Sequence, residues 1–256
     1  MAEPLLQVRD LRKAFGGIRA VDGVGFDLGA GEVCALIGPN GAGKTTLFHL
    51  LAGQLRPDAG SVRLRGEELT GLPAFGIWRR GIGRTFQITA TFASLTCLEN
   101  VQAALASKAG RRFDLWTPAA ALARQPGLEL LAQVGLAAQA GRRAHALAFG
   151  DRKRLELALA LAGDPALLLL DEPAAGMAPA ERGELMALVS ALVEARGLAV
   201  LFTEHDMDVV FGTAARVMVL HEGRLIADGS PAAVRADAGV QAAYLGSPDA
   251  EGAAQP

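Results

Sequence analysis

The stretch GPNGAGKTT, from Gly38 to Thr46, has the composition and spacing of a phosphate-binding loop. It matches the pattern G-x-x-x-x-G-K-[ST], follows the apolar segment EVCALI, and leads into the helical pattern TTLFHLLAGQL. Small residues let backbone N–H groups surround phosphate oxygens, and the dipole of the following helix adds to the attraction. We expect Lys44 to reach the β- and γ-phosphates and the Thr45 hydroxyl to bind Mg²⁺. A chance glycine-rich turn is the alternative, but lysines are scarce in this chain, occurring only as Lys13, Lys44, Lys108 and Lys153.

A pair of acidic residues, Asp171 and Glu172, follows the apolar run LLLL. Ligands of parallel sheets bind at the carboxyl ends of the strands, where this pair is expected to lie. Asp171 is expected to hold Mg²⁺, through water, and Glu172 to orient and deprotonate an attacking water, a role worth roughly 10²–10⁴ in rate. Two solvated acids at a strand end are the alternative. Together with the phosphate loop, the pair favours hydrolysis of a nucleotide.

These residues need a sheet to position them, and the chain offers one. Continuous apolar runs such as ALLLL and LAVLF are typical of strands buried on both faces of a mostly parallel sheet. Helical patterns at residues 44–54, 180–196 and 206–212 separate several strand-like runs, which predicts an α/β domain. The strand-like runs are LLQVRD, VGFDL, EVCALIG, SVRLRG, ALLLLDEP, GLAVLFTEH, ARVMVLHEG and RLIADG.

Residues 88–162 break this alternation, because they carry helical patterns with alanine-rich faces and several Gly- and Arg-containing turns. We interpret them as a helical subdomain inserted into the α/β core. The predicted organisation is therefore a first part of the core over 1–87, the helical subdomain over 88–162, a second part of the core over 163–246, and a flexible tail over 247–256.

Composition narrows the class of protein. The chain has 25 basic and 27 acidic residues, so no positive excess favours nucleic acid as a partner. Two cysteines are too few for a disulfide scaffold and fit a reducing compartment. Mean hydropathy is +0.27. No apolar run approaches the roughly 18 residues of a membrane helix, and the start MAEPLLQVRD lacks the features of a signal peptide. We expect a cytoplasmic protein; if it works at a membrane, it docks there onto another protein.

The order and spacing of six motifs resemble those of the ATP-binding-cassette (ABC) ATPases. GIGRTFQ supplies a Q-loop glutamine, LAFGD stands at the place of the LSGGQ signature, and LLLLDEP resembles the Walker B strand. AAGMAP occupies the D-loop position, LFTEHD carries a switch histidine, and LRKAFGG carries an aromatic residue. The resemblance covers nearly the whole chain. It implies a P-loop NTPase (RecA-like) core of α/β class, with an antiparallel β region and an inserted α-helical subdomain.

The same resemblance implies roles for individual residues. Phe15 would stack on adenine, Gln87 would contact Mg²⁺ and the attacking water, and His205 would bond the γ-phosphate opposite Glu172. Mg²⁺ would then have Thr45, Gln87 and Asp171 around it. The expected ATP-binding residues of the loop are Gly38, Pro39, Asn40, Gly41, Ala42, Gly43, Lys44, Thr45 and Thr46.

The segment LAFGDRKRLELALA, residues 147–160, has two interpretations. It could be a structural helix, opened and capped by Gly150 and Asp151, with a row of leucines toward a core. By resemblance, its start would instead act in trans on the ATP bound by a partner cassette. The residues expected to do so are Leu147, Ala148, Phe149, Gly150 and Asp151.

This chain departs from the family pattern at a few positions. Ala148 stands where serine is usual, which removes a hydroxyl that could bond the γ-phosphate. Phe149 replaces a glycine and Asp151 a glutamine. In the D-loop, Ala178 replaces an acid or amide and removes a polar contact across the dimer. We expect a functional ATPase in which the two sites of a dimer can be unequal.

Within the family, the sequence is similar to the ATP-binding subunits of branched-chain amino-acid importers, with FGG, GIGRTFQ, LTCLENV and the terminal VQAAYLG as the shared features. The helical insert around residues 110–127 favours the longer, G-type subunit. The resemblance implies two transmembrane permeases, a second ABC ATPase subunit and, indirectly, a periplasmic binding protein, at the cytoplasmic face of the membrane. A heterodimer of cassettes is favoured over a homodimer. Phe92 and Leu95 would line the permease groove, unless they belong to the core of the helical subdomain.

Two other functions stay open at this level. A mechanical cassette in translation or DNA repair is disfavoured, because the chain has one uninterrupted cassette and no basic excess. A nucleotide-binding scaffold with weak hydrolysis is disfavoured by Glu172 and His205, whereas Ala148 and Ala178 favour it. A GTPase is disfavoured further, because the sequence has no N-K-x-D motif.

Overall fold

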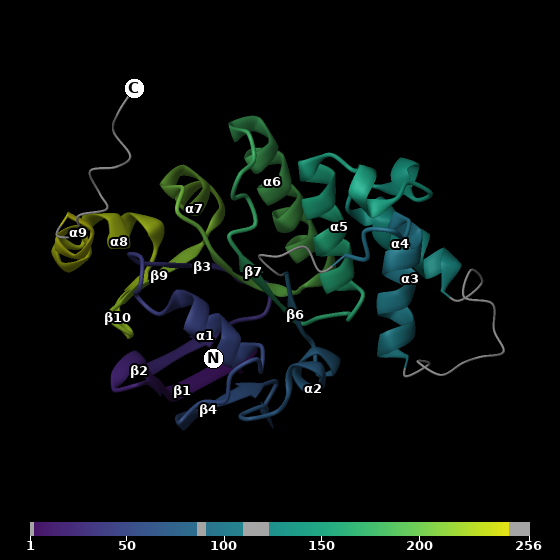
Figure 1. Ribbon diagram of the computed structural model, residues 1–256. Coiled ribbons are helices and arrows are strands. Elements are labelled where there is room, and N and C mark those ends of the chain that lie inside the picture. Colours follow the sequence, from purple (N-terminus) through teal and green to yellow (C-terminus); the bar gives the residue numbers. More distant parts are fainter. Residues whose placement is uncertain (1–2, 86–90, 110–122, 246–256) are drawn as a thin grey trace.

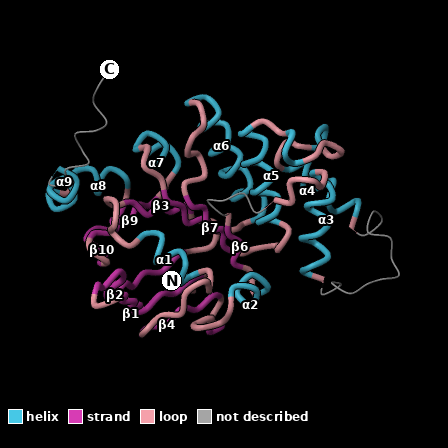
Figure 2. Tube along the Cα trace, viewed as in Figure 1, coloured by secondary structure: helices cyan, strands magenta, loops and turns pink. Residues whose placement is uncertain are grey.

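A computed structural model describes residues 3–85, 91–109 and 123–245. Its centre is a six-stranded sheet in the order β10 (Arg224–Gly229), β9 (Arg216–His221), β3 (Val33–Ile37), β8 (Ala199–Thr203), β7 (Leu167–Asp171) and β6 (Ile82–Arg84). All neighbours are parallel except β9 and β10. The three central strands β3, β7 and β8 are buried along their whole length, as expected for a sheet covered on both faces (Figure 2).

A second sheet lies below the first in Figure 1 and is antiparallel, in the order β2 (Ile18–Leu28), β1 (Leu6–Phe15), β4 (Ala59–Leu64) and β5 (Glu67–Glu68). Helix α1 (Lys44–Leu51) lies between the two sheets (Figure 1), and its Leu47, Phe48 and Leu51 are fully buried. They share one hydrophobic cluster with strand residues of both sheets. The apolar side chains of α1 therefore hold the two sheets together.

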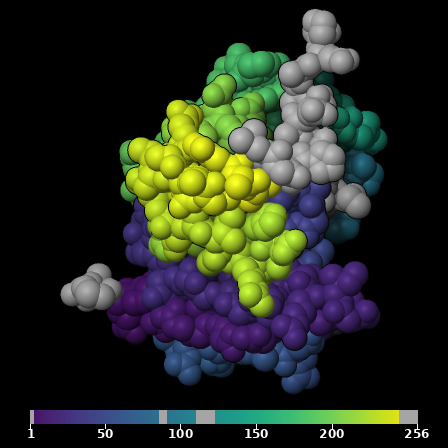
Figure 3. All heavy atoms as spheres, turned by 90° about the vertical axis from the view of Figure 1, so that its left-hand side faces the viewer, coloured from purple at the N-terminus to yellow at the C-terminus, as the bar shows by residue number. Residues whose placement is uncertain are grey.

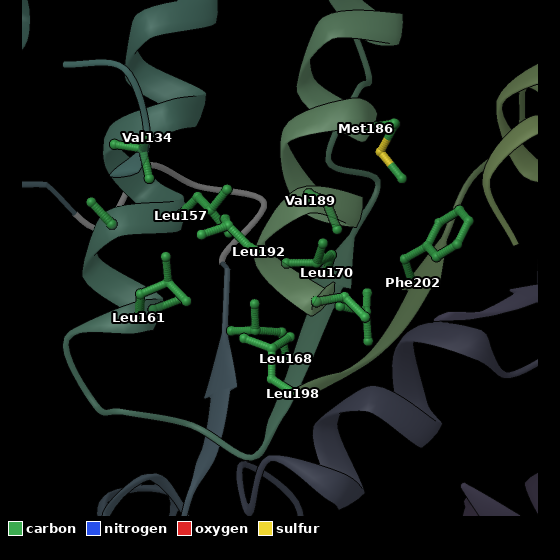
Figure 4. Close-up of a cluster of buried hydrophobic side chains, with 14 of the residues drawn as sticks. Val134, Leu157, Leu161, Leu168, Leu170, Met186, Val189, Leu192, Leu198 and Phe202 are labelled. Atoms are coloured by element: carbon green, nitrogen blue, oxygen red, sulfur yellow. The ribbon is translucent and has the colours of Figure 1, made fainter. Parts of the chain in front are cut away.

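The opposite face of the parallel sheet is covered by α5 (Phe149–Leu161) and α6 (Pro179–Arg196). Successive side chains of a strand point to opposite faces. Accordingly, Leu168 and Leu170 of β7 join this second cluster, whereas Leu167 and Leu169 join the cluster around α1. Figure 4 shows Leu168 and Leu170 beside side chains of α5 and α6. The run of leucines is thus explained by a strand with two buried faces.

Helices α3 (Cys97–Lys108) and α4 (Arg124–Gln133) pack beside α5 at the edge of the molecule (Figure 1). A capping box starts α3, since Thr96 accepts from the backbone N–H of Glu99 and the Glu99 carboxylate accepts from that of Thr96. Two short 3₁₀ turns, Ala137–Gln139 and Ala144–Ala146, lead into α5. These described helices all fall within the range 88–162.

The C-terminal part of the chain packs against its beginning. Figure 3 shows the yellow C-terminal segment above the purple N-terminal strands, and β10 contacts β2. Arg224 of β10 pairs with Asp22 of β2 at 2.6 Å. Helices α7 (Met207–Thr213), α8 (Pro231–Ala236) and α9 (Ala238–Leu245) complete this region. Among the described residues, no helix is both long and apolar enough to span a bilayer.

The structure confirms the predicted α/β class and all the predicted strands, with small differences at the ends of elements. The helix predicted over 44–54 ends at Leu51. Gly53 is the cause, because it adopts φ +68° and a side chain there would lie 2.6 Å from the Leu72 carbonyl oxygen. Helix α2 (Ala74–Arg79) and strand β6 were not predicted as elements. The expected tail, 247–256, lies outside the described residues.

Candidate functional site

The phosphate-binding loop joins β3 to α1, as predicted. Two of its glycines are required by close backbone contacts: a Cβ atom at Gly38 would lie 2.1 Å from the Leu220 carbonyl oxygen, and one at Gly43 2.1 Å from that of Ala20. Both adopt positive φ, +155° and +104°. The loop is therefore pressed between β9 and β2. Packing against these two strands already requires glycine at both positions.

Lys44 begins α1 and folds back over the loop. Its Nζ donates to the carbonyl oxygens of Gly38 at 2.5 Å and Pro39 at 3.1 Å. Burial lowers the pKa of Lys44, and the nearby carboxylates of Glu172 and Asp171 partly oppose this shift by raising it. Anionic groups near Nζ favour the charged amine, so a phosphate at this position would stabilise it further.

The other residues of the loop lie where the pattern places them. Asn40, Gly41 and Thr45 are exposed, and Ala42 is buried. Thr45 and Thr46 occupy the first turn of α1, where backbone N–H groups have no partner inside the helix. The exposed Thr45 hydroxyl is thus free of the core and available at the helix N-terminus.

Asp171 ends β7 and is 4 % exposed. Each carboxylate oxygen has a donor: Thr203 Oγ1 lies 2.9 Å from Oδ1, and Arg84 Nη2 lies 2.9 Å from Oδ2. The guanidinium compensates the buried charge, which without a partner would be strongly unfavourable. Asp171 is therefore held in one orientation by two neighbouring strands, β6 and β8.

Glu172 has a strained backbone at the same sheet edge. Its φ is +48°, which a residue with a side chain rarely adopts. Its backbone N–H donates to both the carbonyl oxygen and the hydroxyl of Thr203, each at 3.1 Å. The side chain is a quarter exposed, and its Oε1 lies 3.0 Å from Nε2 of His205. The acid and the histidine therefore form a direct pair just after β7 and β8.

The loop that carries His205 is anchored on both sides. Glu204 is 5 % exposed and accepts from the backbone N–H of Ala174 at 2.7 Å. Burial raises the pKa of Glu204. Asp206 caps α7 through the N–H groups of its first turn and is bonded by Arg182. Arg182 also donates to the Met177 carbonyl oxygen at 2.8 Å. The histidine loop is thus tied to the segment 174–177 that follows Glu172.

Phe15 ends β1 at a hairpin whose tip is Gly16 and Gly17. Its ring is exposed, and Lys13 Nζ lies 5.6 Å from the ring centroid. The paired strand β2 contacts the phosphate loop at Ala20. An exposed aromatic ring on this hairpin is accessible to a flat base, as the prediction for Phe15 requires.

The segment 147–151 differs from the simple structural interpretation in one detail. Ala148, and not Gly150 or Asp151, is the N-cap of α5, and no side chain caps it. Its backbone is extended, at φ −61° and ψ 160°, so the helix begins at Phe149. Leu147 is buried in the core, whereas Phe149 is 43 % exposed and its ring lies beside Gly176. The start of α5 thus presents uncapped backbone N–H groups at the surface.

One site residue lies outside the described part of the chain: Gln87. Sequence reasoning also missed three residues of the site, namely Arg84, Thr203 and Glu204. Arg84 could have been recognised from the sequence, because it is the charged last residue of the apolar segment GIGR. If that segment forms a buried strand, its arginine needs an acidic partner. Among the described residues, no three His, Cys, Asp or Glu side chains gather around a point that could hold a metal.

One edge of the parallel sheet carries a phosphate-binding loop, a buried aspartate and a Glu–His pair. Together with the inserted helical layer, this arrangement defines a P-loop ATPase. The ABC transporter family matches residues 21–175, and the family described as branched-chain amino acid ATP-binding cassette transporter matches residues 224–250. The chain belongs to the ABC transporter family, and it is an ATPase of that type.

Individual relatives agree with this membership. The chain is 41 % identical to the high-affinity branched-chain amino acid transport ATP-binding protein LivG of Salmonella typhimurium, over 96 % of this chain and 99 % of LivG. It is 40 % identical to BraF of Pseudomonas aeruginosa, with the same coverage. The ADP conformation of MJ1267, an ATP-binding cassette of an ABC transporter, superposes with a TM-score of 0.85 at 28 % identity, over 96 % of this chain and 100 % of MJ1267.

Proposed function

We propose that the chain powers an importer of branched-chain amino acids or related small amides and acids, by hydrolysing ATP on the cytoplasmic face of a membrane. The main structural support for ATP hydrolysis is the contact between Glu172 and His205 beside the loop that contains Lys44. The substrate class rests on the C-terminal match at residues 224–250 and on the names of LivG and BraF.

We propose Mg²⁺ as the companion of ATP. Thr45 and Asp171 offer an exposed hydroxyl and a carboxylate, the hard oxygen donors that Mg²⁺ prefers. Asp171 would hold the ion through a bound water, which suits an ion that keeps several waters and binds substrate phosphates. Gln87 is proposed as a further ligand. When bound, the ion would neutralise charge on the phosphate oxygens.

The hydrolytic step uses Glu172 as general base toward a water aimed at the γ-phosphorus. His205 Nε2 lies 3.0 Å from the Glu172 carboxylate and orients it. Because Nε2 carries a single hydrogen, it would exchange this contact for a γ-phosphate oxygen when ATP is bound. Lys44 would exchange its bonds to Gly38 and Pro39 for phosphate oxygens. The proton leaves the water for Glu172, the water oxygen bonds to phosphorus, and the bond to ADP breaks.

We infer that two cassettes are needed for each hydrolytic event, with segment 147–151 acting on the partner's ATP. The exposed, uncapped start of α5 supports this, because a helix N-terminus without side-chain caps attracts phosphate. Ala148 offers no hydroxyl, so the contribution is mainly that of the backbone. A dimeric cassette, MJ0796 bound to ADP and phosphate, superposes with a TM-score of 0.75 at 25 % identity, over 88 % of this chain and 98 % of MJ0796. We favour a heterodimer with a second cassette.

Permease subunits are proposed to dock in a groove between the core and the helical layer. A cavity of about 500 Å³ lies there between α2, β6, α3 and α5, and its lining includes Phe75, Trp78 and Phe92. Phe92 is 62 % exposed, which supports its predicted place in the groove. Leu95 is partly buried and is not part of the lining. We also propose the domain organisation predicted from the sequence, with the core formed by residues 1–87 and 163–246, the helical subdomain by 88–162 and the tail by 247–256.

The proposal is tested with the chain assembled in vesicles with two candidate permease subunits and a candidate second cassette from the same organism. A periplasmic binding protein loaded with leucine should raise ATP hydrolysis several-fold above the rate with the empty binding protein. Phe92→Ser should abolish that rise and leave ATP binding unchanged. A complex that responds to an aromatic acid or to urea, and not to leucine, would correct the substrate class. A complex whose hydrolysis is the same without permeases would contradict the transport function.

A further inference from the structure

Arg84 has a place in the fold that the hydrolytic step above does not explain. It ends β6, the edge strand of the parallel sheet, and its side chain is only 7 % exposed. A buried guanidinium is unfavourable unless it has partners, and burial accordingly lowers the pKa of Arg84 while Asp171 raises it. Its partners therefore indicate what it does.

The guanidinium forks between two regions of the molecule. Nη2 donates to Oδ2 of Asp171 at 2.9 Å, on the nucleotide side of the sheet edge. Nη1 donates to Oε1 of Gln54 at 2.6 Å, and both Gln54 and Arg84 line the groove cavity. One planar group thus bonds the Walker B carboxylate with one nitrogen and a groove residue with the other. The spacing of these nitrogens is fixed, because the guanidinium is rigid.

Asp171 has little freedom once both partners are in place. Thr203 Oγ1 holds its other oxygen at 2.9 Å and also accepts the backbone N–H of Glu172 at 3.1 Å. A shift of Arg84 would therefore change the orientation of Asp171 and, through Thr203, strain the backbone of Glu172. The guanidinium carbon also lies 5.9 Å from the centroid of the Phe48 ring.

We propose that Arg84 is a positioning residue through which occupancy of the groove reaches Asp171, by the connection Gln54–Arg84–Asp171. A permease segment bound in the groove would either compete with Arg84 for Gln54 or strengthen the bond between Gln54 and Arg84. In both cases it would change how firmly Arg84 holds Asp171. This inference rests on the proposed function, since it needs a permease in the groove. It assigns Arg84 no contact with ATP.

The first test measures nucleotide binding and not turnover. Fluorescent ADP is titrated into the isolated chain with and without Mg²⁺, for wild type, Arg84→Met and the control Arg63→Met, whose exposed side chain pairs with Glu68. The factor by which Mg²⁺ tightens ADP binding should fall at least five-fold in Arg84→Met alone. ADP binding without Mg²⁺ should stay within two-fold in all three proteins, which shows a folded site. An unchanged or larger Mg²⁺ factor in Arg84→Met would overturn the positioning role.

The second test is a double-mutant cycle in vesicles with the permeases. The ratio of ATP hydrolysis with permeases to hydrolysis without them is measured for Gln54→Ala, Arg84→Met and the double variant. If the two residues form one connection, the double variant loses no more of the ratio than Arg84→Met alone. If the loss of the ratio in the double variant equals the product of the two single losses, Gln54 and Arg84 act independently, and the proposal is overturned. A wild-type ratio of one would contradict the proposed function itself and remove the basis of this inference.

Discussion

Nε2 of His205 lies 3.0 Å from Oε1 of Glu172, although the two residues follow different strands and are separated by 33 positions. The contact exists because β7 and β8 are parallel neighbours whose carboxyl ends share one edge of the sheet. It places a carboxylate and an imidazole together at the edge of the sheet, and the carboxylate is near enough to Lys44 of the phosphate-binding loop to oppose the lowering of that lysine's pKa by burial.

Replacing Glu172 by glutamine keeps the shape of the side chain and removes the base. We expect kcat for ATP hydrolysis to fall at least roughly 100-fold, the scale of general-base catalysis, with ATP affinity unchanged or higher. Steady-state hydrolysis and equilibrium ATP binding check this. Glu129→Gln, an exposed acid on α4, is the matched control and should keep wild-type activity. Turnover that survives in Glu172→Gln would mean that another group activates the water.

His205→Ala should lower kcat about ten-fold or more, because the Glu172 carboxylate loses the partner that orients it. The effect should not add to that of Glu172→Gln, since residues acting as one unit give non-additive losses. The measurement is kcat for both single variants and the double variant. His145→Ala, an exposed histidine near α5, serves as control. If the loss of kcat in the double variant equals the product of the two single losses, the 3.0 Å contact does not contribute to catalysis.

Gly150→Ala separates the fold of the chain from its role toward a partner. An added Cβ atom would lie 3.5 Å from Met177 and 3.8 Å from Glu181, ordinary contact distances. The free energy of unfolding should therefore stay the same or rise by up to about 1 kcal/mol, because alanine favours a helix over glycine. Hydrolysis by the assembled pair should nevertheless fall, with ATP binding at Lys44 intact.

Gly183→Ala in α6, where a Cβ atom meets nothing within 4 Å, is the control for Gly150→Ala. Each variant is assembled with a wild-type second cassette, and ATP hydrolysis and ATP binding are measured on the pair. Hydrolysis equal to wild type in the Gly150→Ala pair would contradict a role in trans.

Phe15→Ala should weaken ATP binding roughly five- to a hundred-fold, the equivalent of about 1–3 kcal/mol for stacking of one base on an aromatic ring. Phe15→Trp should retain affinity. Binding of pyrophosphate, which lacks a base, should be the same in all variants. Ile18→Ala removes an exposed apolar side chain from the same hairpin and is the control. Equal losses for ATP and pyrophosphate would point to a distorted hairpin instead of a lost stack.

Glu204 should make stability depend on pH in a definite direction. Burial raises its pKa above the ordinary value of 4.5, so the folded state favours the protonated form. Its contribution to stability is full below that ordinary value and is lost as pH rises through the folded pKa. Glu204→Gln cannot ionise and can still accept the N–H of Ala174. Urea unfolding should show this variant gaining stability relative to wild type between pH 4.5 and pH 8. A difference that does not change with pH would show that the carboxyl stays ionised.

Local sequence was sufficient for the parts of the site that depend on spacing along the chain. The positions of the glycines around Lys44 and of the two acids after the leucine run could be predicted from the sequence. Both groups follow an apolar run that forms a strand, so they lie at the carboxyl end of that strand. The continuous burial of Leu167–Leu170 likewise follows from a strand with two covered faces.

The bond between Arg84 and Asp171 could not be predicted in the same way, because the two residues are 87 positions apart. It depends on which strand lies next to β7 and on a register that pairs Arg84 with Leu169. The N-cap at Ala148 was also missed, since its small side chain gives no capping signal and only the backbone defines it. Long-range register and backbone geometry are set by tertiary packing, which local patterns do not contain.

Uptake of radiolabelled leucine into vesicles that contain the assembled transporter tests the central claim most directly. With ATP and Mg²⁺ supplied on the side of this chain, wild type should accumulate leucine, and Glu172→Gln should abolish both accumulation and hydrolysis while the complex stays assembled. Leucine accumulation that continues in Glu172→Gln, or that needs no ATP, would contradict the account.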